Sequence, residues 1–203
     1  MKRPPILSEI VAVVILIAAS VAGCNSSSQP RPRGYFRIDM PEKSYVAYDS
    51  TCPFTFEYPS YGVIAPSDEI EPQPCWFNIE FPSYKAKLHI SYREVGNEFN
   101  SLLEDAYTLA YKHSVKADAI SEIPFENVEE RVFGLLYDLK GNTATAVQFY
   151  LTDSLKHFIR GSLYFYASPN ADSLAPVIDF FRDDIIHIME TTRWNDNKQT
   201  ARQ

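Results

Sequence analysis

The stretch ERVFGLLYDLKGNTATAVQFYLTDSLKHFIRGSLYFYA, residues 130–167, decides the fold that the sequence predicts. Within it, apolar and polar side chains alternate in three successive segments, and this period of two is typical of β-strands. We expect strands at residues 130–139, 143–151 and 157–167. Gly141-Asn142 lies in the first joint and Asp153-Ser154 in the second, and such short joints favour antiparallel neighbours. The stretch therefore predicts an antiparallel meander.

Segments on both sides of the meander complete the predicted fold. We expect further strands at residues 53–59, 76–81 and 85–93, where the same alternation occurs. Apolar side chains recur at spacings of three and four over residues 97–114 and 172–194, which predicts two amphipathic helices. Pro124 discourages a further helix before the meander. The predicted fold class is α+β, a single antiparallel β-sheet with two main helices packed on it.

The N-terminus has the layout of a secretory signal. Lys2 and Arg3 precede the uninterrupted apolar run Ile10–Ala19, and small residues follow. The run is short for a membrane span, which needs about 20 residues. Val21-Ala22-Gly23-Cys24 resembles the bacterial lipobox, whose cysteine thiol receives a diacylglycerol before the chain is cut in front of it. An uncleaved N-terminal anchor helix is the alternative interpretation.

These features divide the chain into four parts. We expect a lipoprotein signal peptide at 1–23, a flexible tether at 24–34, a single α+β domain at 35–194 and a disordered C-terminal tail at 195–203. The tether is rich in serine and proline, which build no core. Two or more acyl chains on Cys24 would hold the protein stably on a bilayer.

Cys52 and Cys75 remain after the lipidation site is set aside. Export implies an oxidising compartment, where an even pair of cysteines usually forms a bridge. Both lie beside predicted strands, so a disulfide between them is sterically plausible. The alternative is two buried free thiols, because free cysteine is among the most buried residue types.

Composition and motifs argue against several classes of function. The formal net charge is −7 without a basic cluster, which argues against nucleic-acid binding. The four histidines are His89, His113, His157 and His187, and their spacing predicts no metal site. A G-x-S-x-G elbow is absent, and the seven glycines form no phosphate-cradling loop. We expect no cofactor and no metal.

The sequence also contains two pairs of adjacent carboxylates. Glu129-Glu130 and Asp183-Asp184 are the candidates for acid–base chemistry. Adjacent side chains on a strand or helix point apart, so neither pair forms a natural dyad. We interpret both pairs as part of solvated faces, and the sequence predicts no enzyme.

A tyrosine-rich strand end is the candidate partner surface. Alternation in the segment 161–166 places Tyr164 and Tyr166 on one face, opposite Leu163 and Phe165. Tyrosine is enriched in interface hot spots, so this face could dock a partner. The alternative is that a helix covers it, as in sheets with helices on both sides.

Several long segments carry a resemblance to a known family. They are His113–Ile120, Gly134–Asn142, Gln148-Phe149, Thr152–Ser154, His157–Tyr166, Pro169–Val177 and Glu190–Trp194. Together they resemble the gliding-motility lipoprotein GldD of Bacteroidota, over nearly the whole mature chain from Gly34-Tyr35. The order of strands and helices also resembles that of the photosystem protein PsbP.

The resemblance to GldD implies a membrane-bound lipoprotein needed for gliding and for type IX protein secretion. It supplies no catalytic residue, so the implied role is a non-catalytic assembly or interaction component that binds other gliding and secretion proteins of the envelope. The expected location is periplasm-facing, with the outer membrane favoured over the inner. The alternative is a membrane-tethered small-ligand-binding or enzymatic domain.

Overall fold

The computed structural model describes residues 38–71, 73–112, 117–166 and 170–195, which all belong to one compact unit. The predicted signal peptide, Cys24 and the tether lie outside the described residues, as does the tail from residue 196. Within the described ranges, no helix combines the length and the hydropathy that a bilayer crossing requires.

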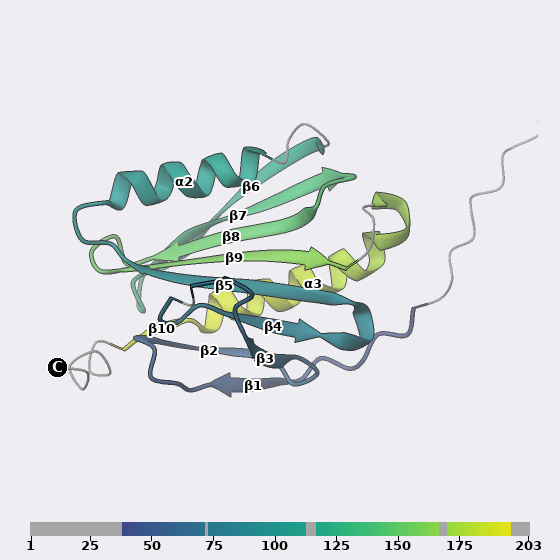
Figure 1. The fold of residues 1–203 in the computed structure, drawn as a ribbon, viewed down its shortest axis with the longest axis horizontal. Coiled ribbons are helices and arrows are strands. Elements are labelled where there is room, and N and C mark those ends of the chain that lie inside the picture. Colours follow the sequence, from purple (N-terminus) through teal and green to yellow (C-terminus); the bar gives the residue numbers. More distant parts are fainter. Residues whose placement is uncertain (1–37, 72, 113–116, 167–169, 196–203) are drawn as a thin grey trace, which may run out of the picture. The chain divides into compact units, whose positions relative to one another are not determined.

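A seven-stranded antiparallel sheet forms the centre of the fold (Figure 1). Its strands are β3 (Val63–Pro66), β4 (Phe77–Phe81), β5 (Ala86–Glu94), β6 (Ala117–Asn127), β7 (Val132–Gly141), β8 (Thr145–Thr152) and β9 (His157–Phe165). They lie in the order β3-β4-β5-β9-β8-β7-β6. The predicted meander is present as β7, β8 and β9, which pair with their sequence neighbours. The strand β6 extends it at the edge, where Pro124 is tolerated because an edge strand has unpaired N–H positions.

A second, smaller sheet corrects the expectation of a single one. It contains β1 (Tyr45–Tyr48), β2 (Phe54–Pro59) and β10 (Arg193–Trp194), with β2 in the middle. The predicted strand at 53–59 therefore exists, but it pairs with segments from the two ends of the domain rather than with β4 or β5. The α+β class itself is confirmed.

The two main helices are α2 (Phe99–Lys112) and α3 (Ala171–Thr191), and a short 3-10 helix, η1 (Pro82–Tyr84), links β4 to β5. Asn170 caps α3, because its side chain accepts a hydrogen bond from the amide of Ser173. The prediction that this helix continues to Trp194 is wrong. Thr192 has an extended backbone, so the helix ends there and the next two residues pair with β2.

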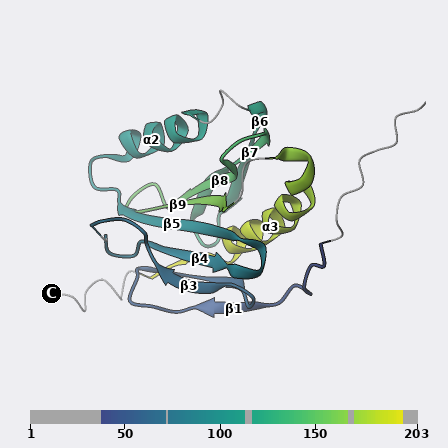
Figure 2. The same cartoon turned by 45° about the vertical axis from the view of Figure 1, so that its right-hand side comes forward.

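The helices lie on opposite faces of the seven-stranded sheet (Figures 1 and 2). The main core lies between that sheet, α3 and the smaller sheet, and its largest fully buried side chains include Phe54, Phe149, Phe181, Leu88 and Leu163. The other face packs less extensively against α2, through Leu102, Ala106 and Ala110. One face of the sheet is thus sealed and the other only partly covered.

The cysteine pair that the sequence singles out is bonded. Cys52 and Cys75 form a disulfide with their Cα atoms 5.7 Å apart, which joins the approach to β2 with the approach to β4. Cys52 is buried beside the main core. The bridge therefore links the two sheets covalently.

We expect the double variant Cys52→Ser/Cys75→Ser to lower the free energy of unfolding by about 3 kcal/mol, because the bridge restricts the unfolded chain. Urea denaturation followed by tryptophan fluorescence measures the change. Reduction of the native protein serves as the control and should give the same loss. An unchanged unfolding midpoint in both experiments would contradict the prediction.

Candidate functional site

Two adjoining cavities lie on the α2 side of the seven-stranded sheet. One has a volume of about 310 Å³ and the other about 600 Å³. Glu69, His89 and Tyr164 line both of them, so they form a continuous depression that we call the sheet-face groove. Concave sites with apolar walls and a few polar groups are the usual places for ligands.

Strands β5 and β9 provide the floor of the groove. Their alternation sends Leu88 and Leu163 into the main core, so His89 and Arg160 face the groove from neighbouring positions. The register supports this placement, because Ser91 of β5 lies opposite Arg160 of β9. The antiparallel pairing thus gathers polar side chains from two strands on one face.

The walls come from separate parts of the chain. Along the smaller cavity, α2 contributes Leu102 and Ala106, which pack with Phe158 of β9. The segment 67–70 after β3 lines the larger cavity. The helix also contributes Asp105, so the groove is mainly apolar on the helix side and polar on its floor.

Arg160 is the main charged group in the floor. Its Nη2 donates a hydrogen bond to Oε1 of Gln148 at 2.5 Å, and burial lowers the pKa of its guanidinium. Within the described residues, no carboxylate lies within ion-pair distance of it. Gln148 is itself buried, and its Nε2 has no hydrogen-bond partner in the same part of the chain. Arg160 and Gln148 thus form a polar site whose hydrogen-bond donors are not all used within the described residues.

His89 lies beside this pair and is held by a side-chain amide. Nδ1 of His89 is 2.9 Å from Oδ1 of Asn78, whose Nδ2 donates to the carbonyl of Pro66. Oδ1 of Asn78 is therefore an acceptor, and Nδ1 of His89 carries the proton. Burial lowers the pKa of His89, the charge of Glu69 opposes this shift, and the charges of Arg160 and Lys87 act in the same direction as burial.

This lowered pKa predicts a pH dependence of stability. The folded state favours neutral His89, so its contribution is fully present above the unfolded pKa of about 6.5 and is lost as the pH falls through the lower folded value. We expect His89→Gln to weaken the decline of the unfolding free energy between about pH 7.5 and pH 5. Urea denaturation across this range measures it, and equal slopes in both proteins would contradict it.

The two tyrosines of the predicted partner surface lie at this groove. Tyr164 lines both cavities, while Tyr166 is 58% exposed and its hydroxyl donates to the Glu80 carboxylate at 3.1 Å. The helix α2 packs against Phe158 on the same face but leaves Tyr166 open. A role for the two tyrosines in partner binding stays a prediction.

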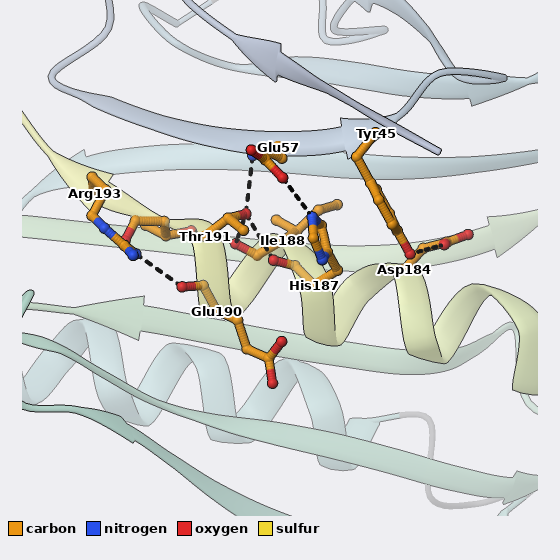
Figure 3. A network of polar contacts seen from close by, with 9 residues as sticks. Tyr45, Glu57, Asp184, His187, Ile188, Glu190, Thr191 and Arg193 are labelled. Carbon is orange, nitrogen blue, oxygen red and sulfur yellow. Dashed lines mark hydrogen bonds and ion pairs between the residues drawn. The ribbon is translucent and has the colours of Figure 1, made fainter. Parts of the chain in front are cut away.

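A polar network on the opposite side of the sheet holds α3 against the smaller sheet (Figure 3). Asp184 is only 1% exposed and accepts hydrogen bonds from Lys43 at 2.6 Å, Tyr45 at 3.0 Å and Tyr61 at 2.5 Å. The interpretation of Asp183-Asp184 as a solvated pair is therefore wrong for Asp184. Helical rotation turns it toward the strands, while Asp183 is exposed.

The charge of Asp184 raises the pKa of the tyrosines that surround it. Burial and the charge of Asp184 raise the pKa of Tyr45 to about 12, and the same two causes raise the pKa of Tyr61. Figure 3 also shows His187, which stacks on Tyr45 at 3.6 Å and lies 2.8 Å from the Glu57 carboxylate. With three side chains donating to it, Asp184 acts as a structural anchor.

The other sequence candidates are dispersed. Glu129 and Glu130 are exposed, and Glu130 pairs with Arg193 at 2.9 Å. Of the histidines, His113 lies outside the described residues, and His157 is in the core 2.9 Å from the Tyr92 hydroxyl. No three His, Cys, Asp or Glu side chains in the described ranges are grouped to hold a metal ion.

Comparisons with known proteins give similar solved structures and a matching family. The solution structure of cyanobacterial PsbP (CyanoP) from Synechocystis sp. PCC 6803 is similar with a TM-score of 0.46 and 13% identity, covering 80% of this chain and 97% of that one. The comparison with curated proteins gives no match. The model of the family described as gliding motility lipoprotein GldD matches residues 25–194. Because this match spans most of the sequence, the chain belongs to the GldD family of gliding motility lipoproteins.

Proposed function

We propose that the protein is a membrane-anchored lipoprotein that supports gliding motility and type IX protein secretion as a non-catalytic component. The match to the GldD family over residues 25–194 carries this proposal, since the family is associated with gliding motility. In this role the folded domain binds other envelope proteins, and Cys24 holds it at the membrane. The source organism is expected among Bacteroidota.

The anchor has a direct test. We expect native protein to incorporate labelled palmitate, and Cys24→Ser to incorporate none, because only a thiol accepts the diacylglycerol. The variant Cys52→Ser/Cys75→Ser is the matched control, since it removes the other two cysteines and should keep the label. Palmitate on Cys24→Ser would contradict the lipobox interpretation. Fractionation of the native lipoprotein then distinguishes the favoured outer membrane from the inner.

The interaction role is tested in a deletion strain. Loss of the gene should abolish both surface spreading and the export of type IX substrates, and the native chain should restore them. A strain that keeps both processes would overturn the proposal. Chemical crosslinking of the native lipoprotein in membranes, followed by mass spectrometry, identifies the envelope proteins that it contacts.

The sheet-face groove supports a second candidate, a membrane-tethered domain that binds a small ligand. Arg160 and His89 together present polar groups beside apolar walls, as ligand sites do. Alanine variants of the polar groove residues separate the two candidates. Full complementation by all of them favours the assembly role, and loss of spreading despite normal folding favours the ligand-binding role.

A further inference from the structure

Arg160 is half-buried and has no ionic partner among the described residues, which sets it apart from Arg182, a second half-buried arginine of this domain. Arg182 pairs with Asp138 at 2.9 Å and also with Asp179. Arg160 has only the neutral amide of Gln148 as its partner among the described side chains. A charge taken from water without a counter-ion is costly to the fold, so such groups are usually paired.

The surroundings of Arg160 offer space for the missing partner. Arg160 lines the cavity of about 310 Å³, together with the apolar side chains of Leu102, Ala106 and Phe158. Its Nη2 is fixed by Gln148, which in turn accepts at 3.5 Å from the hydroxyl of Ser162. A planar guanidinium that is held in place presents its remaining N–H groups in a fixed fork, which matches a carboxylate.

The other charged groups of the cavity favour a ligand with a single negative charge over one with two. Glu69 and Asp105 also line it and would repel a dianion such as a phosphate monoester. Arg93 lines it too, but this arginine is exposed and lies 5.6 Å from the Trp76 ring. A ligand with one negative charge and an apolar body would pair with Arg160 on the floor and contact the apolar side chains on the helix side.

We propose that the sheet-face groove binds an organic monocarboxylate, whose carboxylate pairs with Arg160 and whose apolar body lies against Leu102, Ala106 and Phe158. Gln148 positions the guanidinium, and its free Nε2 is a second donor near the same site. The inference goes beyond the proposed role in motility and secretion, and it holds or fails independently of that role.

Calorimetry on the mature lipoprotein in lipid nanodiscs tests the proposal, with empty nanodiscs as the blank. The probes are 3-phenylpropionate and 4-phenylbutyrate, their uncharged amides, and phenyl phosphate. We expect at least one carboxylate to bind about tenfold more tightly than its amide, because a charge-assisted hydrogen bond is lost in the amide. Phenyl phosphate should bind more weakly than that carboxylate.

Three substitutions test whether Arg160 causes this preference for the carboxylate. Arg160→Met keeps the length but removes the charge, and it should bring the ratio of carboxylate to amide affinity to about one. It should unfold at about the same urea concentration as the native protein, because it removes a half-buried charge that lacks a counter-ion among the described residues but also removes a hydrogen bond to the buried Gln148. Arg160→Lys should keep part of the preference. Arg93→Gln, on the same cavity, is the matched control and should keep all of it.

The outcomes are decisive in each direction. Preference for a carboxylate that disappears in Arg160→Met and survives in Arg93→Gln supports the site. Equal affinity of every carboxylate and its amide for the native protein overturns it, as does the absence of binding up to millimolar probe concentrations. Tighter binding of phenyl phosphate overturns the assignment to monocarboxylates. The first comparison needs no variant, so a misfolded substitution leaves the proposal testable.

Discussion

Replacement of Asp184 by alanine should lower the free energy of unfolding by about 3 kcal/mol. Asp184 is buried and accepts hydrogen bonds from Lys43, Tyr45 and Tyr61. Lys43 and Tyr45 lie just before and at the start of β1, and Tyr61 lies in the β2–β3 turn, so one carboxylate ties two separate parts of the chain to α3. Its removal leaves all three donors without this acceptor.

Asp183→Ala is the matched control, because its side chain is exposed on the same helix. We expect a change of less than about 0.5 kcal/mol there. Asp184→Asn should lie between the two, since it keeps an acceptor oxygen but loses the charge. Urea denaturation followed by tryptophan fluorescence compares the four proteins. If Asp184→Ala and Asp183→Ala unfold at the same urea concentration, the anchor role is wrong.

Gly134→Ala should lower the free energy of unfolding by at least about 3 kcal/mol. Gly134 lies in β7 opposite Leu151 of β8. A Cβ at this position would overlap the carbonyl oxygen of Tyr150 and press on the side chain of Leu151. Because the obstacle is backbone in the middle of a sheet, no side-chain rotation relieves it, and the two strands must separate locally.

The control for this prediction is Gly96→Ala. Gly96 has a φ of +50° but open space where a Cβ would lie, so the substitution carries only the strain of the left-handed region. That strain costs about 1 kcal/mol. Thermal or urea unfolding of both variants tests the difference. A Gly134→Ala protein as stable as Gly96→Ala would show that β7 and β8 tolerate separation.

Local sequence pattern was sufficient for the elements whose periodicity is long and regular. The alternation in β7, β8 and β9 predicts their existence and their pairing, and the spacing of apolar residues predicts both main helices. Their ends differ from the prediction by a few residues, because the end of an element depends on capping and on the next segment. The α+β class follows from these elements alone.

Short strands and edge strands have too little regular alternation to be predicted from local sequence pattern. Local alternation does not predict β1, β3 or β6, and the helical spacing of apolar residues runs on through β10. A two-residue strand such as Arg193-Trp194 has no period to detect, and it forms only because β2 offers a free edge. The residue Pro124 weakens the strand pattern of β6, which the sheet tolerates at its edge.

The candidate site was likewise predictable from local pattern only in part. Alternation places Tyr164 on the face opposite Leu163, and it equally places Arg160 there, which was the available signal for the groove floor. Among the described residues no carboxylate lies within ion-pair distance of Arg160, and this depends on which strands meet in space, which no local pattern reveals. The burial of Asp184 likewise depends on the position of β1, which the sequence did not predict.

The arrangement of the smaller sheet has a consequence for the timing of folding. The middle strand β2 has partners from both ends of the domain, residues 45–48 and 193–194. A chain that is made from its N-terminus can complete this sheet only after nearly all of it has been synthesised. Until then β2 keeps one open edge, and open edges recruit other chains. A chain truncated so that it ends before Arg193 should therefore aggregate more during export, even though its seven-stranded sheet would be complete.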